Sequence, residues 1–277
     1  EPGATGDGGL TDPLNPQLAA PGLACAGLCP QGNFQAAPGG SKDSGAPPPS
    51  TGGAIYYVRP GGGSISQCTG KANKDYPGSG SGQACAVKHP FYLLPPSGKA
   101  IFKGGDTMVV ASGEYRMGVG APGDVGCDKA FAWDCYMADI PSGTAKTPTR
   151  ILGQGWNSGC KTAPQFYGVE RADHVLSLDN ADHVQIQCLE ITDHSSCVEF
   201  HSGKLSCKRS GYPNGDWSAL GLQASDSSDV LLKHVDIHGM AASGVLAGRL
   251  KNWTVEDSKI NGNGWVGWDG DLQAKSG

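Results

Sequence analysis

The side chains best suited to acid–base chemistry lie in the short segment Val198-Glu199-Phe200-His201. If this segment is a strand, alternation turns Val198 and Phe200 inward and leaves Glu199 and His201 on the outer face. A carboxylate and an imidazole at such positions could serve as general acid and general base. Outward groups on neighbouring strands would lie about 4.8 Å apart. Strand-like segments further along the chain could add Gln223, Arg249 and Asp269 to that face.

The candidate catalytic set is therefore Glu199, His201, Arg249 and Asp269. Glycoside hydrolysis needs two carboxylates at a set separation. β-Elimination on a uronate needs a basic residue and a group, often Ca²⁺, that neutralises the substrate carboxylate. The predicted face offers scattered single groups, so we expect no strong hydrolase or lyase activity and no cofactor. Calcium would enter only under the lyase alternative.

Three Asp-His dipeptides, at 173–174, 182–183 and 193–194, could suggest metal binding. Each of them flanks a strand-like segment, where Asp and His favour turns by bonding to nearby backbone. We therefore predict no metal site.

Three aromatic residues, Tyr212, Trp265 and Trp268, could stack on sugar rings. The two tryptophans flank the dipeptide Val266-Gly267 and could equally cover the apolar core near that point of the chain. Glycan binding and core packing therefore both stay open for these residues.

A repeat of about 23 residues positions these side chains in the part of the chain after Phe166. Segments 183–194, 229–240 and 252–263 align without gaps. The aligned positions are Ile186, Leu232 and Val255, then Cys188, His234 and Asp257, then Ile191, Ile237 and Ile260. A second series of strands begins at Val175, Val198, Leu220, Val245 and Val266. Stacking such units buries apolar faces that no single unit could bury alone.

Three stretches carry a resemblance to a known family: YYVRPGG at 56–62, GGDTMVVASGEYR at 104–116, and the VxIxxxxI coils that begin at Val184. Together they resemble secreted right-handed parallel β-helix proteins of the pectin-lyase-like superfamily, over about residues 54–277. The resemblance implies an all-β chain folded as a right-handed parallel β-helix solenoid with an irregular Pro/Gly-rich N-terminal extension. It implies no single activity, because that superfamily includes lyases, hydrolases, epimerases, adhesins and non-catalytic surface proteins.

The chain divides by composition into three parts, with boundaries at 1–53, 54–165 and 166–277. Residues 1–53 hold about half of the 19 prolines and are too poor in apolar side chains to offset the entropy of ordering. Residues 54–165 are expected to form the N-terminal cap and the first irregular coils, and residues 166–277 the regular coils. We expect the last coil to be continued by further chain or covered by a partner, with self-association through residues 1–53.

The ten cysteines indicate disulfides and an oxidising compartment. Neighbours in sequence suggest the pairs Cys25–Cys29, Cys68–Cys85, Cys127–Cys135, Cys160–Cys188 and Cys197–Cys207. The net charge of −5 and the absence of a Lys/Arg run exclude an electrostatic footprint for nucleic acid. No segment approaches the ~18 apolar residues of a membrane helix.

These observations favour a secreted or cell-surface structural or interaction protein, such as a subunit of an extracellular assembly or filament. The alternative is a polysaccharide lyase or glycoside hydrolase that uses the β-helix face. A second alternative is a non-catalytic glycan-binding module.

Overall fold

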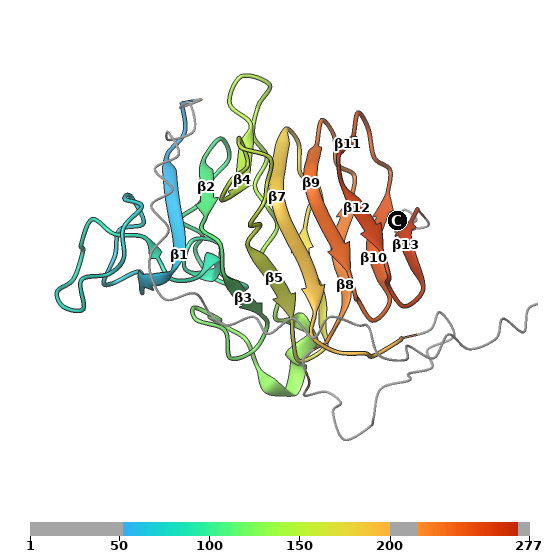
Figure 1. The fold of residues 1–277 in the computed structure, drawn as a ribbon, viewed down its shortest axis with the longest axis horizontal. Coiled ribbons are helices and arrows are strands. Elements are labelled where there is room, and N and C mark those ends of the chain that lie inside the picture. Colours follow the sequence, from blue (N-terminus) through green and yellow to red (C-terminus); the bar gives the residue numbers. More distant parts are fainter. Residues whose placement is uncertain (1–51, 200–214, 216, 271–277) are drawn as a thin grey trace, which may run out of the picture. The chain divides into compact units, whose positions relative to one another are not determined.

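The computed structural model describes residues 52–199, 215 and 217–270. Regular structure in these residues is almost entirely β, and the exceptions are two short 3-10 helices, η1 (Pro90–Tyr92) and η2 (Lys129–Asp134). Every pairing between the named strands is parallel (Figure 1). The predicted all-β class with parallel strands is therefore confirmed. No helix among the described residues has the length and apolar character needed to cross a membrane.

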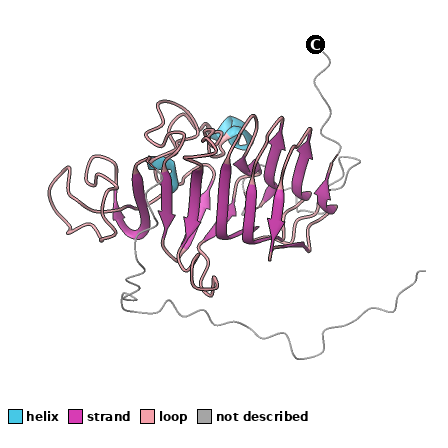
Figure 2. Cartoon of the chain, turned by 90° about the horizontal axis from the view of Figure 1, so that it is seen from above, coloured by secondary structure: helices cyan, strands magenta, loops and turns pink. Residues whose placement is uncertain are grey.

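The strands form two sheets. The larger sheet contains β1 (Ile55–Gly63), β2 (Thr107–Val110), β3 (Glu114–Met117), β4 (Thr149–Gly153), β5 (Gln165–Gly168), β7 (Val184–Asp193), β9 (Leu231–His238), β11 (Thr254–Glu256) and β12 (Lys259–Asn261). The smaller sheet contains β6 (Ala172–Ser177), β8 (Ser218–Ser225), β10 (Ser243–Gly248) and β13 (Val266–Asp269). Strands distant in sequence thus lie side by side in rows, as Figure 2 shows from above.

The register of the larger sheet confirms the alignment of the three repeated segments. Ile186 of β7 pairs with Leu232 of β9, which pairs with Val255 of β11. The second apolar column, Ile191, Ile237 and Ile260, is paired in the same way. These columns face the core, since four of the six side chains, those on β7 and β9, are at most 1% exposed.

A corner interrupts each of these long strands at the middle column of the alignment. Cys188, His234 and Asp257 all have positive φ, of 58°, 52° and 49°. L-residues adopt this left-handed conformation rarely, and it changes the direction of the chain. As a result β7 pairs with β4 before the corner and with β5 after it, and β9 pairs with β11 and β12 in the same way.

The register predicted for the second series of strands is wrong. Leu220 pairs with His174, whereas Leu222 pairs with Leu176. In addition, β6 pairs directly with β8, so the segment at Val198 does not lie between them.

The misassignment has a local cause at Gly221. A Cβ on Gly221 would lie 2.6 Å from Cγ2 of Ile237, so this glycine faces the core. Its neighbour Leu222 is also buried in the main core cluster. Two consecutive core-facing positions break the alternation on which the prediction relied.

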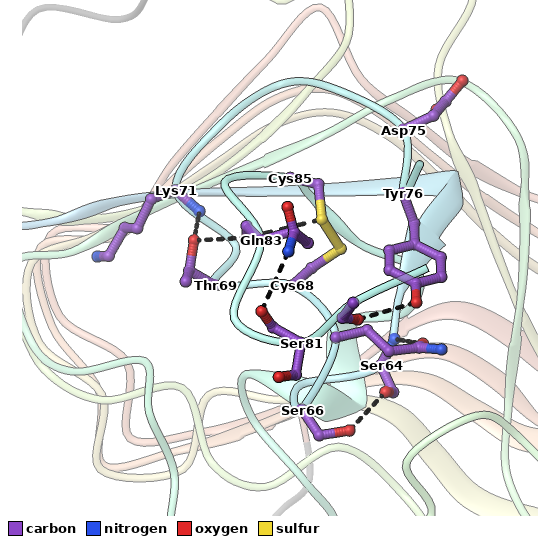
Figure 3. The surroundings of a disulfide bond; sticks show 12 residues. Ser64, Ser66, Cys68, Thr69, Lys71, Asp75, Tyr76, Ser81, Gln83 and Cys85 are labelled. Atoms are coloured by element: carbon purple, nitrogen blue, oxygen red, sulfur yellow. Dashed lines mark hydrogen bonds between the residues drawn. A yellow bond between two sulfur atoms is a disulfide. The ribbon is translucent and has the colours of Figure 1, made fainter. Parts of the chain in front are cut away.

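The region before β5 is irregular and is held by disulfides. Three predicted pairs are present, Cys68–Cys85, Cys127–Cys135 and Cys160–Cys188. Figure 3 shows the first of them in a loop that hydrogen bonds reinforce, including one of 2.9 Å from Tyr76 Oη to the Gly80 carbonyl. Cys197 is also disulfide-bonded. The other predicted cysteines, Cys25, Cys29 and Cys207, lie outside the described residues.

Candidate functional site

The predicted catalytic residues do not meet in one place. Glu199 forms an ion pair with Arg171, and its backbone N–H donates to the carbonyl of Ala241 at 2.6 Å. These contacts place it beside the first residues of β6 and β10. Arg249 follows the last residue of β10 and pairs with Asp226. Glu199 and Arg249 therefore lie at opposite ends of the strands of the smaller sheet.

Asp269 lies apart from both of these pairs. It shares a row with Gln223, because both residues pair with Leu246 of β10. The side-chain amide of Gln223 donates to Asp179 at 2.8 Å. The fourth predicted catalytic residue, His201, lies outside the described residues.

The two predicted sugar-stacking tryptophans belong to separate apolar clusters. Trp268 packs against the main core and meets Trp253 edge to face, with ring centroids 5.9 Å apart. Trp265 packs against a different cluster that includes Leu220 and Ala242. They do not form one stacking platform, and Tyr212 lies outside the described part of the chain.

The outer face of the larger sheet carries a polar row that the sequence analysis missed. In register across β5, β7, β9 and β12 stand Gln165, Glu190, Asp236 and Lys259. Glu190 Oε1 accepts a hydrogen bond of 2.9 Å from the amide of Gln165 and lies 3.0 Å from His238 Nε2. Adjacent parallel strands are about 4.8 Å apart, so Glu190 and Asp236 bring two carboxylates onto neighbouring strands.

Two histidines extend this row into a network. His194 Nε2 lies 2.6 Å from Gln165 Oε1, and its ring stacks on Tyr167 with centroids 4.0 Å apart. On the other side, His238 Nδ1 lies 3.4 Å from the hydroxyl of Thr192. His238 is therefore held at both ring nitrogens, by Glu190 and by Thr192.

The Glu190–His238 contact changes the acidity of both groups. The hydrogen bond from His238 is the largest influence on Glu190, and it holds the pKa of that carboxyl below its ordinary value. Glu190 in turn raises the pKa of His238, with a smaller contribution from the charge of Asp236. Both shifts favour the ion pair of carboxylate and imidazolium.

A buried carboxylate, Asp193, ends β7 next to this network. Burial raises its pKa to about 7, against the opposite effect of the hydrogen bonds that it accepts. The donors are the backbone N–H and the hydroxyl of Ser195, at 2.9 and 3.1 Å, and the N–H of Ser218 at 3.2 Å. One carboxylate thus holds the end of β7 and the start of β8.

A pocket of about 290 Å³ lies beside the polar row. Its charged lining residues are Lys161, Glu190, Asp236, Asp257 and Lys259, and His234 also lines it. The Cys160–Cys188 disulfide ties the loop that carries Lys161 to the corner of β7. The described residues include no group of three or more His, Cys, Asp or Glu side chains that could hold a metal ion.

The chain matches no protein-family model and shows no significant match among curated proteins.

The missed row was visible in the aligned repeats. Glu190, Asp236 and Lys259 occupy one column of the three segments, at spacings of 46 and 23 residues. That column alternates with the apolar ones and therefore faces outward. The contribution of Gln165 and Lys161 could not be found in this way, because the strand and loop that carry them lie before the repeat begins.

Proposed function

We propose that this chain is an extracellular protein folded as a right-handed parallel β-helix of the pectin-lyase-like kind. Parallel pairing throughout both sheets and a repeating 23-residue register support that architecture. The three disulfides are compatible with an extracellular protein, because disulfides persist in oxidising compartments.

We further propose that its role is structural or interactive rather than catalytic. The observation that carries this proposal is the engagement of two candidate acidic groups, Glu199 and Glu190, by neighbouring side chains. Glu199 is paired with Arg171, and Glu190 is held by His238 and Gln165. A catalytic acid or base must exchange its proton with a substrate. Carboxylates that are already engaged in ion pairs and hydrogen bonds within the protein therefore fit a structural role better than a catalytic one.

The test is a hydrolysis and elimination screen on neutral and acidic polysaccharides, with reducing ends and unsaturated ends as separate readouts. We expect neither product above the background of a heat-inactivated sample. Release that disappears in Glu199→Gln or Glu190→Gln, with the fold retained by circular dichroism, would overturn the proposal.

A polysaccharide-active enzyme is the second candidate, and the pocket beside Glu190 favours it. Two of its three carboxylates, Glu190 and Asp236, stand on neighbouring strands, which lie about 4.8 Å apart. Retaining glycosidases use carboxyl groups separated by about 5–5.5 Å. In the same screen, this candidate predicts activity that Glu190→Gln and Asp236→Asn abolish. The control Glu256→Gln, a carboxylate outside the pocket, should retain that activity.

Glycan binding without cleavage uses the same pocket. In the described part of the chain, the side chains of Lys161, Asp236 and Lys259 form no hydrogen bond or ion pair, which leaves them able to contact hydroxyl groups. Titration with neutral and acidic oligosaccharides, followed by calorimetry, tests this role. Binding that Lys161→Ala and Asp236→Asn weaken together, with no product released, would establish it.

Self-association through residues 1–53 also stays a proposal, since nearly all of this segment lies outside the described residues. Deleting residues 1–50 and measuring particle size by light scattering tests it. A truncated protein of unchanged particle size would exclude the segment from assembly.

A further inference from the structure

Basic residues are concentrated in the part of the fold that precedes β2. Residues 52–106 hold six Lys and Arg residues and two Asp residues, whereas residues 107–277 hold 14 Lys and Arg against 20 Asp and Glu. This first part is therefore positively charged, although the whole chain has a net charge of −5. Charge separated in this way steers an anionic partner to one region of a molecule and repels it from the rest.

Neither acidic residue of this part neutralises a lysine. Asp75 pairs with Arg59, with 2.7 Å between Oδ1 and Nε. Asp106 is buried and accepts hydrogen bonds from the backbone N–H groups of Ala54 and Lys103, at 2.7 and 2.9 Å. Within the described ranges, no lysine side chain of residues 52–106 forms an ion pair or a hydrogen bond. All five are exposed: Lys71, Lys74, Lys88, Lys99 and Lys103.

Three of these lysines, Lys71, Lys74 and Lys88, lie on the segment of residues 64–88, which we call the lysine loop. The loop lies beside β1 (Figure 1). It covers the edge of β1 that does not pair with β2, since the N–H of Tyr57 donates to the carbonyl of Gly70 at 2.8 Å. The described chain thus closes this edge itself, and the exposure of the three lysines does not depend on an unpaired strand.

The backbone of the lysine loop is held by covalent and hydrogen bonds. The Cys68–Cys85 disulfide closes it, and the N–H of Ala86 donates to the carbonyl of Lys74 at 2.9 Å. This hydrogen bond places Lys74 next to the segment that ends at Lys88. A charged group on a fixed backbone loses less freedom when it binds than one on a flexible segment.

Lys71 is positioned by an aromatic ring. Its Nζ lies 3.3 Å from the ring centroid of Tyr56, a cation–π contact. Figure 3 shows the Lys71 side chain pointing away from the disulfide. The contact orients the ammonium group and leaves its hydrogen-bond donors without an acceptor in the described part of the chain.

The chemistry of the lysine loop favours a carboxylated or sulfated glycan over a nucleic acid. Five of the six basic residues are lysines, which act as point charges, and the one arginine is paired with Asp75. The ring of Tyr56 is 8% exposed and lies beneath the ammonium group of Lys71, so it does not offer a face for base stacking. Ser79 and Ser81, exposed on the same loop, add hydroxyl groups that can donate to sulfate or carboxylate oxygens.

We propose that the lysine loop binds an acidic polysaccharide through the ammonium groups of Lys71, Lys74 and Lys88. This names a partner for the interactive role proposed above, and it rests on the extracellular setting proposed there. It does not involve the pocket beside Glu190. Binding and cleavage are separate measurements, so a failure of this proposal is distinguishable from a failure of the proposed function.

Calorimetric titration of the full chain at low ionic strength tests the proposal, with dextran sulfate, alginate and neutral dextran as probes. We expect both acidic polysaccharides to bind, with an affinity that falls as salt is added, because salt screens exposed charges. Neutral dextran should not bind. The variant Lys71→Gln/Lys74→Gln/Lys88→Gln should weaken binding about tenfold, since each exposed ion pair contributes modestly and three are removed together.

The matched control is Lys129→Gln/Lys146→Gln/Lys251→Gln, which removes the same charge from exposed lysines outside residues 52–106. It should bind as the wild type does. Lys74→Gln/Lys88→Gln repeats the test while leaving the contact of Lys71 with Tyr56 in place.

Three outcomes would overturn the proposal: no binding at low ionic strength, equal weakening in the control, or tighter binding of duplex DNA than of dextran sulfate. Binding that Lys161→Gln abolishes and the loop variants leave unchanged would also overturn it, because the pocket would then be the site.

Discussion

The N-terminal region up to β4 and the coils from β8 to β13 are held together in different ways. Strands paired in the N-terminal region are separated by unequal lengths of chain, 52 residues from β1 to β2 and 43 from β2 to β4. In the later coils the separation from β9 to β11 and from β8 to β10 is 23 residues. Equal spacing lets the same kind of side-chain contact repeat from coil to coil.

In the later coils, polar side chains form contacts at this regular spacing. Contacts between side chains 23 residues apart are Asp226–Arg249, Asp229–Asn252, Lys233–Glu256 and His234–Asp257. The irregular region has no such series among the described residues and instead contains long loops closed by disulfides. The difference indicates that disulfides stabilise the chain where the coils differ in length. Where the coils have equal length, core packing and the repeated polar contacts between neighbouring coils stabilise it.

The largest expected effect is the loss of the Cys160–Cys188 disulfide, which closes a loop of 28 residues at the junction of the two regions. The double variant Cys160→Ser/Cys188→Ser should lose about 2–4 kcal/mol of unfolding free energy. Urea denaturation measures this change. A loss no larger than that caused by Lys233→Ala would show that the junction does not depend on its covalent link.

A smaller effect is expected from Gly244→Ala in the regular coils. An added Cβ would lie 2.6 Å from Asn263 Nδ2 and 2.7 Å from the carbonyl oxygen of Gly267. Overpacking of this kind costs about 1–3 kcal/mol. Gly270→Ala is the matched control, because a Cβ there meets nothing within 4 Å. Equal thermal stability of the two variants would contradict the close packing of these coils.

The Glu190–His238 pair should make a pH-dependent contribution to the free energy of unfolding. The lowered pKa of Glu190 stabilises the fold at pH values above 4.5, the ordinary pKa of this carboxyl group, and this stabilisation is lost as the pH falls through the pKa of the folded state. The raised pKa of His238 stabilises the fold at pH values below 6.5, and this stabilisation is lost as the pH rises through the pKa of the folded state. His238→Gln should therefore cost most between these values, about 0.5–1 kcal/mol after solvent screening. Urea denaturation at several pH values checks this window, and a cost independent of pH would contradict the pairing.

The smallest effect is expected from removing one of the exposed polar contacts between residues 23 positions apart. Lys233→Ala should leave the denaturation midpoint unchanged within error, because solvent screens an exposed ion pair. The combined variant Lys233→Ala/Arg249→Ala removes two of these contacts at once and so tests whether they act together. A large loss in the combined variant would mean that the ladder stabilises the coils cooperatively.

The register of the larger sheet could be predicted because its apolar columns alternate cleanly around Ile186 and Ile191. The smaller sheet could not be predicted in the same way, since Gly221 and Leu222 both face the core and break the alternation. The described members of the predicted catalytic set, Glu199, Arg249 and Asp269, are spread along the strands. Alternation predicts which side a residue faces, and it does not predict how far along a sheet two residues lie.

The hydrogen bonds of Asp193 bear on how this chain can be altered. Ser195 and Ser218 both donate backbone N–H groups to the same carboxylate, so the two points of the chain are neighbours although 23 positions separate them. Because β6 pairs directly with β8, the stacking of the smaller sheet does not require the sequence between those serines. The two ends of that stretch still hold the sheet, since Glu199 pairs with Arg171 and Trp217 is buried with Cys197 and Ala241. A foreign sequence grafted between Glu199 and Gly215 would keep these contacts, and we expect it to leave the register of both sheets unchanged.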